Sequence, residues 1–169
     1  MTEHPAIDSR AYRDTLGRMP TGVTIITTCD ADGVRAGATV GSFTSLSLDP
    51  PLVQFSLDKS AICHSQFITC SHFSVNVLAE DQTDLSGIFA SKNERPWDEL
   101  PLVKGEKSNA PLLDGCVAYI ECAHEATYPG GDHDIFVGRV LSLRVEGLDR
   151  RPLLFFGGTY RRLDSDVVS

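Results

Sequence analysis

Alternating and β-branched residues predict β-strands along most of the chain. Residues 23–29 are rich in Val, Ile and Thr and end at the turn-forming residues 30–33, which predicts a hairpin that continues into residues 34–40. Residues 52–57 and 73–78 predict two further strands. The pattern therefore indicates a protein built mainly from strands.

Two long extended runs follow, at residues 116–127 and 135–146. In the second run, Leu141, Leu143 and Val145 alternate with polar residues, which predicts a strand with one buried and one solvated face. Such strands are typical of antiparallel sheets.

Apolar residues at helical spacing occur only in short segments. A first helix is predicted around residues 8–18 and ends before Pro20. Ser60 is a candidate N-cap for a second helix that runs toward Cys70, and an apolar stripe predicts a third helix over residues 81–91.

The strands are not separated by regular helices, so a parallel βαβ fold is excluded. A last strand is predicted at residues 153–156, and it ends at Gly157-Gly158. Residues 91–109 contain prolines, a glycine and charges that break every period, which predicts a long surface loop anchored by Trp97. These patterns predict an antiparallel barrel with short helices at its ends, although they leave barrel and sandwich undecided.

Composition narrows the functional classes. The 169 residues, 41% hydrophobic and 22% charged, predict a single soluble domain spanning 1–169, with an ordered core at about residues 10–163. The net charge of −8 argues against nucleic acid and anionic membranes as partners, and no apolar segment is long enough for a signal peptide or a membrane span. Five cysteines without C-x-x-C spacing argue against a disulfide framework and a zinc site, so a cytoplasmic location is expected.

The richest candidate chemistry lies in residues 37–60, where hydroxyl side chains and glycines follow one strand and precede the next. Small residues allow a ligand to approach the backbone, and their polar groups can bind the edge of a ring that carries many donors and acceptors. A flavin fits this description. Residues 56–60 lie where a strand leads into a predicted helix, and such a turn beside Lys59 suits a phosphate, although a routine helix cap is by itself the commoner explanation.

A second candidate is His133, which lies in a glycine-rich turn between two strands. Histidine changes its charge near neutral pH, so an exposed one can donate a hydrogen bond to a carboxamide or to a reduced flavin. The alternative is a turn histidine bonded to backbone. Asp132 and Asp134 are too close in sequence to form a metal site with His133, and no metal is expected.

Four segments resemble the short-chain flavin reductase family, the split-barrel proteins that supply reduced flavin to two-component monooxygenases. They are Thr39-Val-Gly-Ser-Phe-Thr-Ser45, Phe89-Ala-Ser-Lys92, Gly131-Asp-His133 followed by Gly138 and Val140, and Gly157-Gly-Thr-Tyr160 followed by Leu163. The resemblance covers nearly the whole chain. It implies a mainly β fold, an antiparallel FMN-binding split β-barrel of the Greek-key type with flanking helices.

The resemblance also implies a cofactor, a co-substrate and partners. The cofactor is FMN or FAD, the co-substrate is NADH or NADPH, the chain forms a homodimer, and reduced flavin passes to a separate monooxygenase. His133 is placed near the nicotinamide as the catalytic residue. The residues implied to contact flavin or nucleotide are Thr39, Val40, Gly41, Ser42, Phe43, Thr44, Ser45, Ser56, Asp58, Lys59, Ser60, Phe89, Ala90, Lys92, Asp132, His133 and Tyr160.

The chain departs from the family pattern at two positions. Gly41 stands where many relatives have Asn, so a side-chain contact to the flavin is missing. Ile62 stands where many have Arg, which makes Lys59 or Lys92 the candidate that neutralises the phosphate. Because of these departures, a further alternative stays open, namely that the pocket of the barrel has lost its function.

The predicted activity is reduction of free flavin by NAD(P)H. A Rossmann phosphate fingerprint is absent, so the nucleotide would bind in an open groove against the flavin. Two alternatives remain: a flavoenzyme with tightly bound FMN that acts on an organic substrate, and a flavin-binding electron carrier without catalysis.

Overall fold

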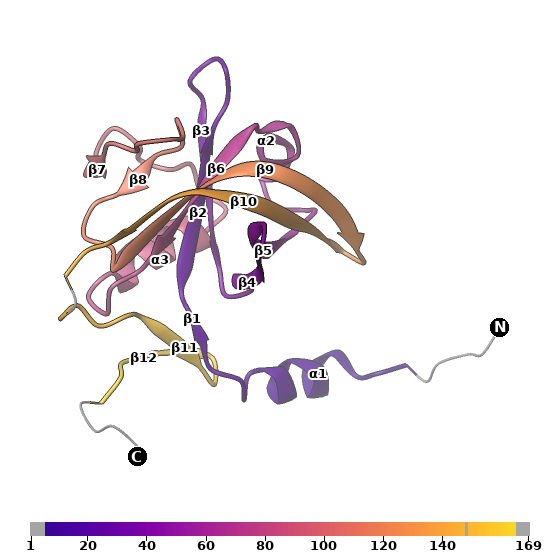
Figure 1. The fold of residues 1–169 in the computed structure, drawn as a ribbon. Helices are drawn as coiled ribbons and strands as arrows, with labels where there is room; N and C mark the ends of the chain where they lie inside the picture. Colours follow the sequence, from indigo (N-terminus) through magenta and orange to yellow (C-terminus); the bar gives the residue numbers. More distant parts are fainter. Residues whose placement is uncertain (1–5, 148, 165–169) are drawn as a thin grey trace.

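The computed structural model describes residues 6–147 and 149–164, which form a strand-rich body flanked by short helices (Figure 1). Both ends that the sequence predicts to be weakly ordered lie partly outside the described residues. The helices are α1 (Ser9–Leu16), α2 (His64–Thr69) and α3 (Thr83–Ala90), and the strands are β1 (Thr21–Gly22), β2 (Thr24–Cys29), β3 (Arg35–Val40), β4 (Thr44–Leu48), β5 (Pro51–Asp58), β6 (His72–Val77), β7 (Leu102–Val103), β8 (Leu112–Leu113), β9 (Ala118–Gly130), β10 (His133–Val145), β11 (Leu154–Phe156) and β12 (Thr159–Arg161).

Seven strands form the main sheet in the order β3-β2-β6-β9-β10-β5-β4, and every pairing within it is antiparallel. The strands at its two ends, β3 and β4, do not pair with each other in the part of the chain that the structure describes. The curled sheet is therefore open along one seam, and β1, β11 and β12 form a separate small sheet.

Two apolar clusters fill the interior. In the first, Phe55 stacks on Phe136 with ring centroids 5.1 Å apart, and Phe67 and Phe73 pack edge-on against Phe55. The second lies beneath α3 and contains Phe89, Tyr119 and Leu153. The alternating strands thus bury one face each, as their sequence pattern predicts.

Gly138 permits the tight packing of β9 and β10 against β6. A β-carbon at this position would overlap the ring of Phe73 and lie 2.9 Å from Cys122 Cβ. The register of β9 and β10 also shifts between Val137 and Gly138. The motif glycine is therefore explained by packing rather than by contact with a ligand.

The predicted hairpin of residues 23–40 is confirmed by the pairing of β2 with β3, but three details of the sequence interpretation are wrong. Ser60 does not cap a helix: α2 begins at His64, because two tight turns with Ala61 N–H donating to Asp58 C=O and His64 N–H donating to Ala61 C=O come first. The strand at 153–156 is not the last one, since Gly157 and Gly158 adopt positive φ and turn the chain into β12.

The third correction concerns β10. Its apolar residues Leu141, Leu143 and Val145 are exposed, Leu143 by 70%. The polar face points inward instead, because the guanidinium of Arg144 lies over the ring of Tyr119, 4.4 Å from its centroid. The end of β10 therefore presents an apolar row to the outside of the chain.

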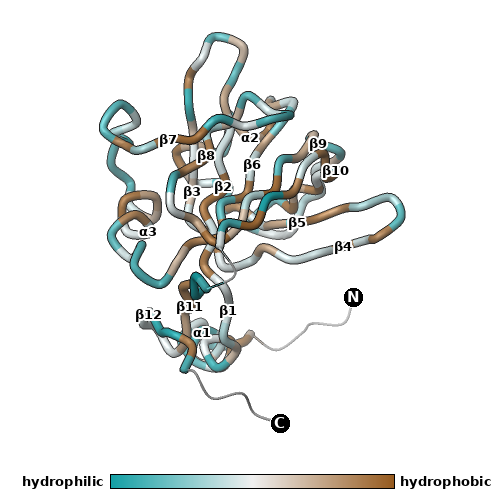
Figure 2. The backbone as a smooth tube through the Cα atoms, turned by 60° about the vertical axis from the view of Figure 1, so that its left-hand side comes forward, coloured by the Kyte–Doolittle hydropathy of each residue, from teal (hydrophilic) through white to brown (hydrophobic). Residues whose placement is uncertain are grey.

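Helix α1 lies apart from the barrel, next to the small sheet (Figures 1 and 2). None of its residues is buried, although Tyr12 and Leu16 are apolar. Gly157 N–H donates to Gly17 C=O over 3.0 Å and so ties the end of α1 to the β11–β12 turn. Among the described residues, no helix has the length and hydropathy that a membrane crossing requires.

Candidate functional site

An open groove of about 640 Å³ follows the seam of the sheet. One wall is the end of β3 with Gly41 and Ser42, and the other is the end of β5 with the turn that follows it. The end of α3 and the inner side of α1 complete the lining. The end strands of the sheet, β3 and β4, do not pair with each other among the described residues, and the groove lies on the β3 side of this opening.

Ser42 connects the two walls. Its hydroxyl donates to Ser56 C=O over 3.0 Å and accepts from Ser56 N–H over 2.9 Å. Thr39 is also engaged, because its hydroxyl donates to Ser86 C=O over 2.8 Å. These hydroxyls thus hold β3, β5 and α3 at the groove, and their hydrogen atoms are not available to a ligand in this arrangement.

The turn after β5 presents a carboxylate to the groove. Ser60 N–H donates to Asp58 Oδ1 over 2.7 Å, and this hydrogen bond lowers the pKa of Asp58. An ionised Asp58 accepts hydrogen bonds from hydroxyl groups but repels a phosphate.

Lys59 points away from the groove. Its Nζ donates to Gly131 C=O over 2.7 Å and lies 3.6 Å from Asp134 Oδ1. The other oxygen of the Asp134 carboxylate, which is nearly buried, lies 2.8 Å from His64 Nε2. Lys59 and His64 therefore fasten the β9–β10 turn to the region around α2.

His133 lies at the start of β10 and lines the groove. Gly131 has a φ of 74°, so it fits the first central position of a two-residue hairpin turn, where glycine is favoured. His133 Nδ1 lies 2.8 Å from Asp132 Oδ1, and the side chain is 41% exposed. With Nδ1 held by Asp132, Nε2 is the ring atom that can meet a ligand, accepting from an amide N–H when the ring is neutral and donating when it is protonated.

The end of α3 supplies positive charge. Lys92 and Arg95 both line the groove. Arg95 donates to the carbonyls of Phe89 and Ser91, over 3.1 and 2.9 Å, so it also closes the helix C-terminus, where cations are favourable. Sequence analysis did not find Arg95, because only the fold of the loop turns its side chain back to the groove.

Tyr160 lies in a neighbouring cavity of about 230 Å³. This cavity and the groove share Thr39, Val40, Gly41 and Ala90, and the Tyr160 hydroxyl donates to Ser86 Oγ over 2.9 Å. Tyr160 therefore lines the neighbouring cavity and is separated from the groove by residues 39–41 of the β3 wall.

Comparison with known proteins identifies the family of the chain. Residues 16–164 match the flavin reductase like domain family. The chain belongs to the flavin reductase family.

Individual relatives agree with this assignment. The chain is 41% identical to the FMN reductase (NADH) SmoA of Agrobacterium fabrum, over 92% of this chain and 86% of that protein. It is 38% identical, over its whole length, to the reductase component of the flavin-dependent trigonelline monooxygenase of Acinetobacter baylyi, of which it spans 55%. The solved structure of the Streptomyces globisporus NADH:FAD oxidoreductase SgcE6, in complex with NAD and FAD fragments, superposes with a TM-score of 0.88 at 38% identity, covering 98% of this chain and 100% of that one.

These findings confirm the fold prediction for this flavin reductase: a mainly β, split-barrel architecture with short helices. They also decide between barrel and sandwich, which the strand pattern left open, because the seven-stranded sheet curls without closing.

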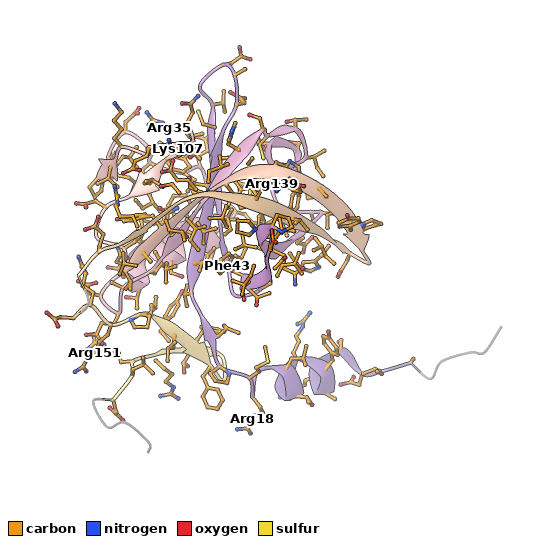
Figure 3. All side chains as sticks on the ribbon, viewed as in Figure 1. Arg18, Arg35, Phe43, Lys107, Arg139 and Arg151 are labelled. Atoms are coloured by element: carbon orange, nitrogen blue, oxygen red, sulfur yellow. The ribbon has the colours of Figure 1, made fainter. Side chains whose placement is uncertain are left out.

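The structure brings most of the predicted site residues of the flavin reductase to the groove, and leaves some outside it. Phe43 packs against the first apolar cluster (Figure 3), and Thr44 donates its hydroxyl to Ser45 C=O. The predicted residues at the groove are Thr39, Val40, Gly41, Ser42, Ser56, Asp58, Ser60, Phe89, Ala90, Lys92 and His133, and those outside its lining are Phe43, Thr44, Ser45, Lys59, Asp132 and Tyr160.

Several lining residues were missed by sequence analysis. Tyr12 and Leu16 stand four residues apart on α1, a spacing that places both on one helix face, so a signal was present. Cys63 follows a turn and gives no such signal. Burial raises the pKa of its thiol, which keeps it protonated at neutral pH.

The groove fits a flavin by its chemistry. Val40, Leu16 and Phe89 provide apolar surface for a flat ring, Asp58 suits the hydroxyls of a ribityl chain, and Lys92 suits a phosphate. Of the two lysines that the sequence offers as candidates for the phosphate, Lys92 lines the groove, whereas Lys59 is engaged elsewhere.

Proposed function

We propose that this protein reduces free flavin, FMN or FAD, with NADH or NADPH and supplies reduced flavin to a separate monooxygenase. The observation that carries the proposal is the groove at the open seam, whose lining combines an apolar wall, an ionised Asp58, a cation and His133 in a chain of the flavin reductase family. The trigonelline relative, named as a reductase component of a monooxygenase, supports the second half of the proposal.

The chain's part in the reaction is to hold two ring systems. Hydride donation and acceptance are supplied by the nicotinamide and the flavin when they are bound. In our proposal the backbone of residues 39–42 and Ser56 lies along the flavin edge, Asp58 accepts from ribityl hydroxyls, and Lys92 pairs with the phosphate. His133 Nε2 meets the nicotinamide carboxamide, and Asp132 holds the ring of His133 in place through Nδ1.

We also propose that residues 1–169 form one domain, that this domain is a homodimer, and that it acts in the cytoplasm. The exposed row on β10 and Leu48, 95% exposed at the tip of β4, are apolar surfaces that a second copy would cover. No residue of helix α1 is fully buried within its own chain, which suits an element that packs against a partner. All five cysteines are unpaired, as expected in a reducing compartment.

The test is NADH and NADPH oxidation by the purified protein, with and without added FMN or FAD. A rate that rises and saturates with added flavin supports the proposal, because a fixed cofactor would not make turnover depend on external flavin. Flavin binding without oxidation of either nucleotide would instead favour an electron carrier. Oxidation that needs an organic substrate would favour the tightly bound flavoenzyme.

A further inference from the structure

The groove continues along β3 into a second cleft of about 500 Å³. The groove touches β3 at Ala38, Thr39 and Val40, and the cleft touches the preceding part of the strand, from Arg35 to Gly37. Ile62, Cys63 and Arg95 line both. Figure 3 shows Arg35 in the half of the molecule that lies away from α1, so the two cavities together follow the length of β3.

Positive charge follows the same path. Lys92 lines the groove, Arg95 lies at the junction of the two cavities, and Arg35 lies in the cleft. Arg95 Nε is buried without a hydrogen-bond partner among the described residues. Two acidic groups oppose these cations: Glu94 lines the cleft, and Asp98 pairs with Arg35 over 3.5 Å. The Asp98 carboxylate is fully exposed, so the pair is weak and a phosphate can displace it.

The rest of the cleft suits a purine. Trp97 is half-buried there and offers an aromatic surface for stacking, which contributes about 1–3 kcal/mol per base in other proteins. Gln66 and Asn93 add side-chain amides, the groups that match the N6 and N7 edge of adenine. The Asn93 amide makes no side-chain hydrogen bond within residues 6–147 and 149–164.

We propose that this cleft binds the adenosine diphosphate half of FAD while the groove binds the flavin half. Arg35 in the cleft would pair with the pyrophosphate, and Arg95 would add positive charge at the junction without a direct bond, because its terminal N–H groups donate to backbone carbonyls. Trp97, Gln66 and Asn93 would hold the adenine. This inference rests on the proposed function, and it assigns a preference for FAD over FMN that the family resemblance leaves open. NADH carries the same adenosine diphosphate group and is the other possible source of it.

The experiment is equilibrium binding, measured by the change in flavin fluorescence for FAD and FMN and by competition with ADP. The intact protein is expected to bind FAD at least about tenfold more tightly than FMN, a difference of about 1.4 kcal/mol. ADP is expected to displace FAD. Arg35→Ala and Gln66→Ala are each expected to raise the dissociation constant of FAD about fivefold to tenfold while leaving that of FMN within about twofold, the effect of losing one polar contact.

Arg139→Ala is the matched control, because Arg139 is also a partly exposed arginine in an ion pair, with Glu125, and lines neither cavity. It should leave both dissociation constants unchanged. If the two cleft variants weaken NADH binding and not FAD binding, the adenosine diphosphate subsite stands but belongs to NADH. Equal affinity for FAD and FMN, with no effect of ADP or of either variant on FAD or NADH, overturns the inference. Failure to bind either flavin would contradict the proposed function itself.

Discussion

At the scale of single residues, the position of a polar group decides whether it can serve a ligand. Lys59 and Lys92 both stand in segments that resemble flavin-binding motifs, but Lys59 Nζ is held by Gly131 C=O and Asp134, whereas Lys92 lines the groove. The Nδ1 atom of His133 is held by Asp132, which leaves Nε2 as the ring atom that can meet a ligand. The proposed chemistry therefore depends more on His133 than on the hydroxyls of Thr39 and Ser42, which are already hydrogen-bonded within the chain.

Replacing His133 by Ala tests this assignment. We expect NADH oxidation to fall about 100-fold, because the nicotinamide loses its orienting contact. The dissociation constant of the flavin should change by less than about threefold, the effect of one ordinary hydrogen bond. Steady-state kinetics and flavin fluorescence measure the two quantities.

His72→Ala is the control for this variant, since His72 lies on β6 and does not line the groove. It should leave the rate unchanged. Equal loss of flavin binding and of NADH oxidation in His133→Ala would mean that His133 holds the flavin, and the proposed role beside the nicotinamide would be wrong.

At the scale of elements, a buried carboxylate on β9 helps to hold the long loop between α3 and β9 to the sheet. Glu121 on β9 is 3% exposed and accepts from the N–H groups of Glu106, Lys107 and Ser108. Burial raises the pKa of Glu121, but these hydrogen bonds and the Ser108 hydroxyl outweigh burial, so the pKa lies below its ordinary value of 4.5. The loop that sequence analysis assigned to the surface is thus anchored at a point that no local pattern reveals.

Replacing Glu121 by Gln should destabilise the fold by about 2 kcal/mol at neutral pH, since hydrogen bonds to a buried charge are lost. The stabilisation comes from a carboxylate whose pKa is lower in the folded state than in the unfolded state. It is therefore present above pH 4.5 and lost as the pH falls through the folded value. Urea unfolding of both proteins should show a free-energy difference that shrinks in acid.

The matched control is Glu125→Gln on the same strand, where the carboxylate pairs with Arg139 at the surface. Its effect on the free energy of unfolding should be much smaller than that of Glu121→Gln, as is usual for an exposed ion pair. A Glu121 variant as stable as the parent at neutral pH would contradict the anchoring role.

At the scale of the whole molecule, apolar surface is left uncovered on β10, β4 and α1. Leu141, Leu143 and Val145 on β10 face outward, as does Leu48 at the end of β4. Tyr12 and Leu16 on α1 line the groove from a helix without buried residues. A second copy that covers these surfaces would also fix α1 and so complete the proposed site.

Leu143→Asp is expected to convert the proposed dimer to monomers, because a charge in the centre of an apolar interface must be desolvated. Sedimentation velocity measures the change, and the affinity for flavin should fall with it. Ile68→Asp, at a 43% exposed position on α2, is the control and should leave the assembly intact. A parent protein that sediments as a monomer at micromolar concentration would refute the homodimer.

The sequence by itself determined the strand-rich class, the main hairpins and the family, because alternation, turn glycines and motif residues act over short distances. It also located most of the groove lining, since one wall comes from a single continuous segment, residues 39–42. The tertiary structure alone decided which polar groups were already engaged, as with Lys59, Thr39 and Ser42. It also brought Arg95 to the groove and set the inward face of β10. These contacts join residues that are distant in the sequence. The positions of such residues relative to one another are fixed only when the sheet curls and its seam stays open.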